Sequence, residues 1–170
     1  MKSSFDLISE KIMDWKTARR TTAAWRVRGG RVVFTNGCFD ILHFGHFHYL
    51  AAAKDLGDRL VIGLNSGESV RRLKGAARPI QDEMTRKIQL AALGFVDAVV
   101  IFEQDDPLEL IKTIAPDILV KGGDWRPDQI IGADFVLKNG GQVMSLPFVE
   151  GYSTTNIEQR IIDRHSSKRP

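Results

Sequence analysis

The sequence has few of the features that mark secreted, membrane-bound or disordered proteins. Cys38 is the only cysteine in 170 residues, so no disulfide can form within the chain and a cytoplasmic location is favoured. No apolar run approaches the roughly 18 residues of a membrane-spanning helix. Asp6, Glu10 and Lys11 interrupt the N-terminal segment where a signal peptide would need a hydrophobic stretch. We therefore expect a cytoplasmic protein with no membrane association.

The excess of charge is also small. The chain has 24 basic and 21 acidic side chains, a net charge of +3, which is too little to indicate a nucleic-acid partner. The excess fits either basic terminal segments or a site for anionic phosphates, and both interpretations stay open. Hydrophobic residues at 43% and charged residues at 26% are ordinary for a globular protein, and the length predicts one domain.

Short β-branched segments alternate with helix-forming segments along the chain. This pattern predicts a Rossmann-like α/β fold, with a doubly wound parallel five-stranded sheet. The expected strands are 31–34, 59–64, 98–102, 118–120 and 142–146, and the expected helices are 43–56, 82–94, 107–114, short helices within 127–139, and 153–162. We divide the chain into a helical lead-in (1–30), a single domain (31–165) and a polar tail (166–170).

The segment between the first strand and the first helix of this domain is suited to binding phosphate. Gly37 allows a ligand to approach the backbone closely. The first N–H groups of a helix lack partners within the helix and carry partial positive charge. His43 and His46 are three residues apart, so they share one face of the helix start. The segment therefore predicts a phosphate site between a helix N-terminus and two imidazoles.

Other polar segments should meet at the same place. Ligands of parallel sheets bind beyond the carboxyl ends of the strands. Residues 35–46, 65–78, 121–125 and 151–155 each follow an expected strand, so we expect them to converge. Residues 67–80 read as a basic loop, either mobile over the site or simply a solvated run of charge.

Three motifs occur in order: Gly37-Cys38-Phe39-Asp40 leading to His43-Phe44-Gly45-His46, then Lys121-Gly122-Gly123-Asp124-Trp125, then Gly151 to Ile157. Together they resemble the H-x-G-H nucleotidyltransferase superfamily in its cytidylyltransferase-like branch. With 71–75 and 78–80, they most resemble heptose-1-phosphate adenylyltransferases, over about residues 32–162. The resemblance implies adenylyl transfer from ATP to heptose 1-phosphate, giving ADP-heptose and pyrophosphate for lipopolysaccharide core synthesis.

The resemblance also implies roles for residues. His43, His46 and Lys74 would be catalytic, as donors to the phosphates. The acceptor phosphate is already an anion, so no general base is required. Further nucleotide contacts are expected from Thr35, Asn36, Gly37, Phe39, Asn65, Gly123, Asp124, Ser153, Thr154 and Thr155.

The sugar phosphate has its own set of expected contacts, namely Cys38, Asp40, Arg78, Lys121 and Trp125. Arg78 could bind the phosphate through two hydrogen bonds. Asp40 could hold the sugar or serve only as a turn carboxylate. The hydroxyls at 153–155 could likewise serve only as helix caps.

Cofactor and partner expectations follow from the same resemblance. Mg²⁺ would be carried by the triphosphate, and we assign it no protein ligands. Cys38, His43, His46 and His48 do not match common zinc spacings. A separate sugar kinase would supply the heptose 1-phosphate, and we expect a homodimer because small enzymes often pair isologously.

Two alternatives remain beside the adenylyltransferase. One is a cytidylyltransferase that acts on glycerol 3-phosphate or a similar phosphorylated alcohol, since the residues alone do not distinguish ATP from CTP. The other is a nucleotide-binding module without turnover. A dinucleotide-dependent dehydrogenase is disfavoured, because no G-x-G-x-x-G follows the first strand of the domain.

Overall fold

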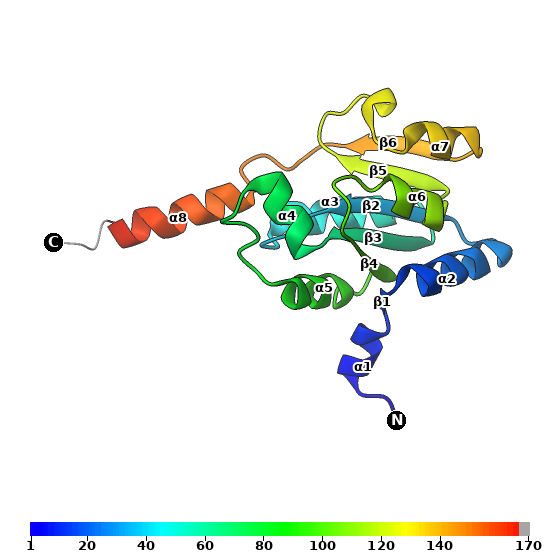
Figure 1. Cartoon of the computed structure of the whole chain (residues 1–170), viewed down its shortest axis with the longest axis horizontal. Coiled ribbons are helices and arrows are strands. Elements are labelled where there is room, and N and C mark those ends of the chain that lie inside the picture. The colour runs from blue at the N-terminus through cyan, green and yellow to red at the C-terminus, as the bar shows by residue number, and fades with distance from the viewer. Residues whose placement is uncertain (167–170) are drawn as a thin grey trace.

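The computed structural model describes residues 1–166, which form a parallel sheet with helices on both faces (Figure 1). The strands are β1 (Ile12–Met13), β2 (Val32–Gly37), β3 (Arg59–Asn65), β4 (Ala98–Phe102), β5 (Ile118–Gly122) and β6 (Gln142–Leu146). The helices are α1 (Ser4–Ser9), α2 (Trp15–Val27), α3 (Phe44–Lys54), α4 (Gly67–Lys74), α5 (Glu83–Ala91), α6 (Leu108–Ile114), α7 (Ala133–Lys138), α8 (Thr154–Ser166) and a short 3₁₀ turn, η1 (Pro127–Gln129). The expected α/β class and parallel sheet are confirmed.

Side chains that alternate between the two faces of the sheet form two separate hydrophobic cores. Val32 and Phe34 of β2 point to the face covered by α2, α6 and α7, whereas Val33 points to the face covered by α3 and α5. Successive side chains of a strand lie on opposite faces, so a continuous apolar run is needed where both faces are covered. The buried apolar strands thus fix the sheet as the middle layer.

The strand order places a topological switch at the centre of the sheet. The order is β1-β4-β3-β2-β5-β6, with all neighbours parallel. The chain moves outward from β2 to β3 and β4, and then crosses back to start β5 on the other side of β2. Connections therefore diverge between the carboxyl ends of β2 and β5, which is where such sheets bind ligands.

The sheet has six strands, not the expected five, because the lead-in is not entirely helical. Ile12 and Met13 pair with Val99 and Val100 of β4. α1 ends at Ser9 with Glu10 as its C-cap, and Asp14 caps the start of α2, so the two helix ends leave a short extended segment free to join the edge of the sheet. The sequence between them is too short to show a strand period.

The basic segment 67–80 is also more regular than expected. Residues Gly67–Lys74 form α4, which begins where the Ser66 hydroxyl accepts from the Ser69 N–H. Ser69 and Val70 are buried, whereas Arg71 and Arg72 face outward. The run of charge is one face of an amphipathic helix. Only the residues after Gly75 form a loop.

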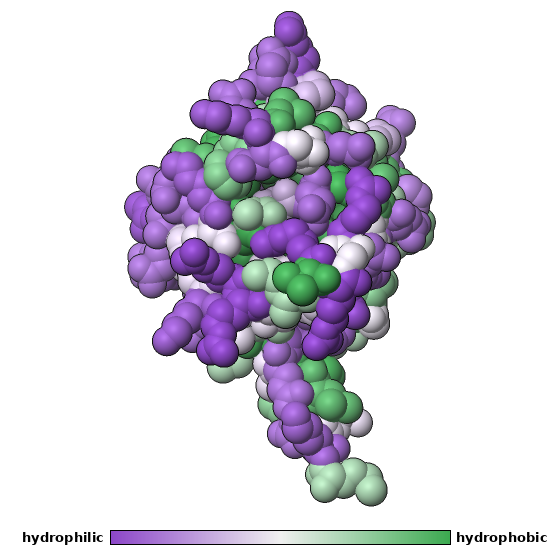
Figure 2. Space-filling view, turned by 90° about the vertical axis from the view of Figure 1, so that its right-hand side faces the viewer, coloured by the Kyte–Doolittle hydropathy of each residue, from purple (hydrophilic) through white to green (hydrophobic). Residues whose placement is uncertain are grey.

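Helix α8 extends away from the sheet (Figure 1), and none of its residues is buried. It runs to Ser166, beyond the expected end at 162, while the remainder of the expected tail lies outside the described residues. The opposite side of the molecule is mainly hydrophilic, with scattered apolar residues (Figure 2). Within residues 1–166, no helix combines the length and the apolar character needed to cross a membrane.

Candidate active site

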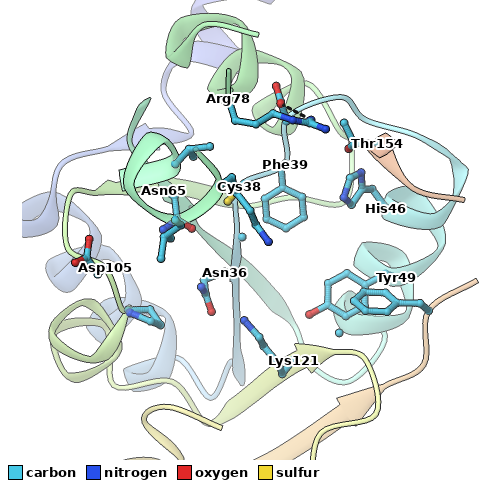
Figure 3. A pocket seen from close by; sticks show the side chains of 18 of the residues that line it. Asn36, Cys38, Phe39, His46, Tyr49, Asn65, Arg78, Asp105, Lys121 and Thr154 are labelled. Carbon is cyan, nitrogen blue, oxygen red and sulfur yellow. Dashed lines mark hydrogen bonds and ion pairs between the residues drawn. The ribbon is translucent and has the colours of Figure 1, made fainter. Parts of the chain in front are cut away.

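A cavity of about 720 Å³ lies at the carboxyl edge of the sheet, at the switch between β2 and β5 (Figure 3). It is large enough for a nucleotide. The expected site residues that line it are Asn36, Gly37, Cys38, Phe39, Asp40, His46, Asn65, Lys74, Arg78, Lys121, Thr154 and Thr155. They come from the ends of β2, β3 and β5, from the last turn of α4 and the segment after it, and from the starts of α3 and α8, so segments far apart in the sequence share one cavity.

His43 and His46 form a stacked pair at the start of α3. Their ring centroids are 3.9 Å apart, and the edge of Phe39 packs on His46 at 5.3 Å. His43 is the N-cap residue, but its side chain accepts no backbone N–H, so it leaves the helix start uncapped. A Cβ on Gly45 would lie 3.2 Å from the His43 ring and from the Tyr152 Cβ. Glycine between the two histidines therefore lets the pair and Tyr152 pack closely.

Both imidazoles favour the neutral form. Burial lowers the pKa of His43. Burial and the neighbouring His43 together lower the pKa of His46 to about 4. The Nδ1 atoms of both rings are buried, and His46 has one backbone hydrogen-bond contact, with Ile41, which opposes the fall of its pKa only in part. At neutral pH each ring therefore has one N–H, which it can donate to an anionic oxygen without first losing a charge.

This pair predicts a pH-dependent stability. Between pH 6.5 and 4 the unfolded chain protonates His46 but the native chain does not, so the free energy of unfolding falls as the pH falls. The expected loss from this residue is about 2 to 3 kcal/mol. Urea unfolding across this range should show a flatter pH slope for His46→Gln than for the wild type. Equal slopes would contradict the low pKa.

Two lysines bring positive charge to the cavity. Lys74, from the last turn of α4, and Lys121, from the end of β5, both line it, and Lys121 points toward Asn36 (Figure 3). Burial and the nearby Lys74 lower the pKa of Lys121. Neither lysine forms an ion pair with a carboxylate within the described part of the chain. Both ammonium groups are thus available to a phosphate.

Asp40 and Arg78 hold one wall of the cavity together. Asp40 accepts from the backbone N–H groups of Ile80 and Gln81, both at 2.9 Å, and from Arg78 at 3.0 Å. Burial raises the pKa of Asp40, but these donors outweigh it and hold the pKa below its usual value. Arg78 also pairs with Glu158 of α8. Arg78 therefore already has two carboxylate partners, and Asp40 is a structural carboxylate.

Other expected site residues lie outside the cavity lining. Thr35 is fully buried, and its hydroxyl bonds that of Tyr49. The Ser153 hydroxyl accepts from the Asn156 N–H and so caps α8. Trp125 donates its indole N–H to the Gly122 carbonyl. Gly123, Asp124 and His43 are also outside the lining, although His43 contacts it through His46. Their ligand contacts stay predictions.

Several residues that line the cavity were assigned no role from the sequence. Phe148 and Tyr49 add aromatic surface near Gly122 at the end of β5, and Ile131 adds aliphatic surface elsewhere in the lining. A Cβ on Gly122 would lie 2.7 Å from the Phe148 ring, so the glycine permits this packing. Burial raises the pKa of Tyr49 to about 12, which keeps it neutral. No local motif signals Phe148, because its neighbour Gly122 is distant in the sequence.

The described residues that line the cavity include few possible metal ligands. Within residues 1–166 no group of three His, Cys, Asp or Glu side chains could hold a metal ion. Of the cavity carboxylates, Asp40 is committed to the 78–81 segment and Asp105 pairs with Arg72. A Mg²⁺ ion that arrives on a triphosphate needs few protein ligands, and its presence here stays a prediction.

The chain is similar to several known proteins. A family model described as Cytidylyltransferase-like matches residues 34–160. The bifunctional protein HldE of Magnetococcus marinus is 55% identical over 90% of this chain, and that of Syntrophotalea carbinolica is 57% identical over 82%. The chain spans only 31% and 29% of the lengths of these relatives.

Solved structures agree with this likeness. The crystal structure of the lipopolysaccharide core biosynthesis protein from Thermoplasma volcanium has 32% identity and a TM-score of 0.57, and the match covers 74% of this chain and all of that one. A pantoate-beta-alanine ligase from Francisella tularensis shares the fold, with a TM-score of 0.58 at 14% identity, covering 94% of this chain and 79% of that one. The match to the family model covers most of the chain. The chain therefore belongs to the Cytidylyltransferase-like family.

Proposed function

We propose that this chain transfers an adenylyl group from ATP to heptose 1-phosphate and releases ADP-heptose and pyrophosphate. The observation that carries the proposal is the stacked pair of neutral histidines at the start of α3, beside a nucleotide-sized cavity with two unpaired lysines. The choice of adenine and of heptose rests on the motifs that resemble heptose-1-phosphate adenylyltransferases. The similar lipopolysaccharide core biosynthesis protein supports the same pathway.

The reaction needs alignment and charge neutralisation more than acid–base chemistry. An oxygen of the sugar phosphate attacks the α-phosphorus of ATP and forms a new P–O bond. The bond between the α-phosphorus and the oxygen bridging to the β-phosphate breaks, and pyrophosphate leaves with the electron pair. The attacking oxygen is already anionic near neutral pH, so no proton has to be removed.

The cavity supplies donors where this charge develops. We assign His43 and His46 to the α- and β-phosphates, since neutral imidazole N–H groups stabilise developing charge without reorganisation. We assign Lys74 to the leaving pyrophosphate, because a lysine on a flexible stem can follow it. The N-terminus of α8 adds Thr154 and Thr155, and Thr154 lies beside His46 (Figure 3). Bound Mg²⁺ would neutralise charge on the phosphates.

Two further proposals concern the cellular setting. A sugar 1-phosphate is made by phosphoryl transfer to a sugar, so we propose that a sugar kinase acts before this enzyme. ADP-heptose would then serve lipopolysaccharide core assembly in the cytoplasm. The expected homodimer stays a prediction.

The direct test is pyrophosphate release with Mg²⁺, with each nucleoside triphosphate paired with heptose 1-phosphate and with glycerol 3-phosphate. We expect release with ATP and heptose 1-phosphate only. Release with CTP and glycerol 3-phosphate would keep the site chemistry and overturn both substrate assignments. ATP binding without release in any combination would instead identify a nucleotide-binding module.

A further inference from the structure

Arg86 of α5 is a fully buried arginine for which the mechanism above has no use. Its exposure is 0%, and it is among the largest side chains that are fully buried. A buried charge is normally paired with an opposite charge, since removing it from water is costly. Arg86 forms no ion pair with any residue of 1–166. Its position therefore calls for an explanation.

One nitrogen of Arg86 ties two strand ends together beneath the cavity. Nη1 donates to the Cys38 carbonyl at 2.9 Å and to the Asn65 carbonyl at 2.8 Å. Cys38 follows β2, Asn65 ends β3, and both line the cavity. The guanidinium thus fixes the backbone from which the floor of the site is built.

The remaining charge of Arg86 is not neutralised by direct contact. Its Nε and Nη2 are buried without a hydrogen-bond partner in the described chain. Glu83, one turn earlier, accepts from the Gly67 N–H at 3.0 Å, and Asp40 is occupied by the 78–81 segment. Both carboxylates act on Arg86 only from a distance. In a poorly solvated interior such a charge is felt over several ångströms.

We propose that Arg86 is a positioning residue for nucleotidyl transfer, one that fixes the ends of β2 and β3 and whose uncompensated charge favours anions in the cavity above. The proposal rests on the proposed function for the identity of the anion, which would be the triphosphate and the pyrophosphate. Arginine suits this double role, because one planar group both donates to two carbonyls and stays charged at every working pH.

The test compares Arg86→Lys and Arg86→Met, with inorganic pyrophosphate as the probe in titration calorimetry at low salt. Arg86→Met should weaken binding at least about tenfold, whereas Arg86→Lys should stay within about threefold because it keeps the charge. The shorter lysine side chain does not place its ammonium where Nη1 lies between the two carbonyls, so Arg86→Lys should lower kcat about tenfold with little change in KM for ATP. Melting temperatures identify the folded variants.

Glu83→Gln is a matched variant for which we expect the opposite effect on pyrophosphate binding. The amide oxygen can still accept from the Gly67 N–H, but the negative charge near Arg86 is gone, so pyrophosphate should bind about two- to fivefold more tightly. Folded Arg86 variants that bind pyrophosphate like the wild type, or a Glu83→Gln variant that binds it no better, would overturn the proposal. If Arg86→Met does not fold, the other two variants still decide. The binding assay needs no turnover, so a wild-type protein that binds pyrophosphate but lacks adenylyl transfer would refute only the proposed function.

Discussion

Replacing His46 with alanine should lower kcat about a thousandfold and leave the fold intact. The ring lies in the cavity lining, is stacked on His43 and is neutral at working pH, so it can donate a hydrogen bond where charge develops on the phosphates. Removing one such preorganised donor typically costs about 10²- to 10³-fold in rate. The loss should appear mainly in kcat, since the donor acts more strongly on the transition state than on bound ATP.

The melting temperature of His46→Ala at pH 7.5 should change little. Alanine removes the buried polar atoms of His46 together with its backbone hydrogen bond to Ile41, so the two effects largely offset each other. His48→Ala is the matched control, because His48 is exposed on the same helix and lies outside the cavity lining. It should retain kcat within about twofold. Near-normal turnover by His46→Ala, or equal losses in the two variants, would remove His46 from the mechanism.

The site could be located from the sequence because its signals are local. The spacing of His43 and His46, the glycine before them and the strand preceding them lie within a few residues of one another. Parallel strands bring their carboxyl ends to one edge whatever the loops do, so the four polar segments could be placed together without coordinates. A phosphate site at a helix N-terminus needs free backbone N–H groups and a few nearby donors, and these local residues are enough to predict one.

The features that were missed depend on contacts across long sequence distances. Arg86 binds carbonyls 48 and 21 residues away, and nothing near it in the sequence marks it as buried. β1 is too short for a period-2 pattern and forms only because β4 offers an open edge. The ion pair of Arg78 with Glu158 could not be foreseen from the sequence, and its contact with the sugar phosphate stays a prediction. Hydrogen-bond, strand and ion-pair partners that are distant in the sequence are set by tertiary packing, so local secondary-structure propensities do not predict them.

Replacing Asp40 with alanine should damage both the stability and the activity of the protein. Its carboxylate accepts from two backbone N–H groups and from Arg78, and alanine would leave those donors without their acceptor. Hydrogen bonds to a charged acceptor contribute about 1.5 to 3 kcal/mol each, but the released donors regain part of this from water, so we expect a net loss of about 2 to 4 kcal/mol in unfolding free energy by urea titration. The released 75–81 segment would also move the cavity wall, lowering kcat/KM about a hundredfold at a temperature where the protein is folded.

Asp97→Ala separates these two effects. Asp97 also accepts from a backbone N–H, that of Leu60, and from two cations, Lys54 and Arg59, but it lies just before β4 at the opposite edge of the sheet. Its loss should destabilise the protein to a similar degree and leave kcat/KM of the folded protein within about threefold. If both variants lose activity equally, turnover follows global stability, and the proposed control of the cavity wall by Asp40 is refuted. If only Asp40→Ala loses activity, the carboxylate acts on the site through the loop that it anchors.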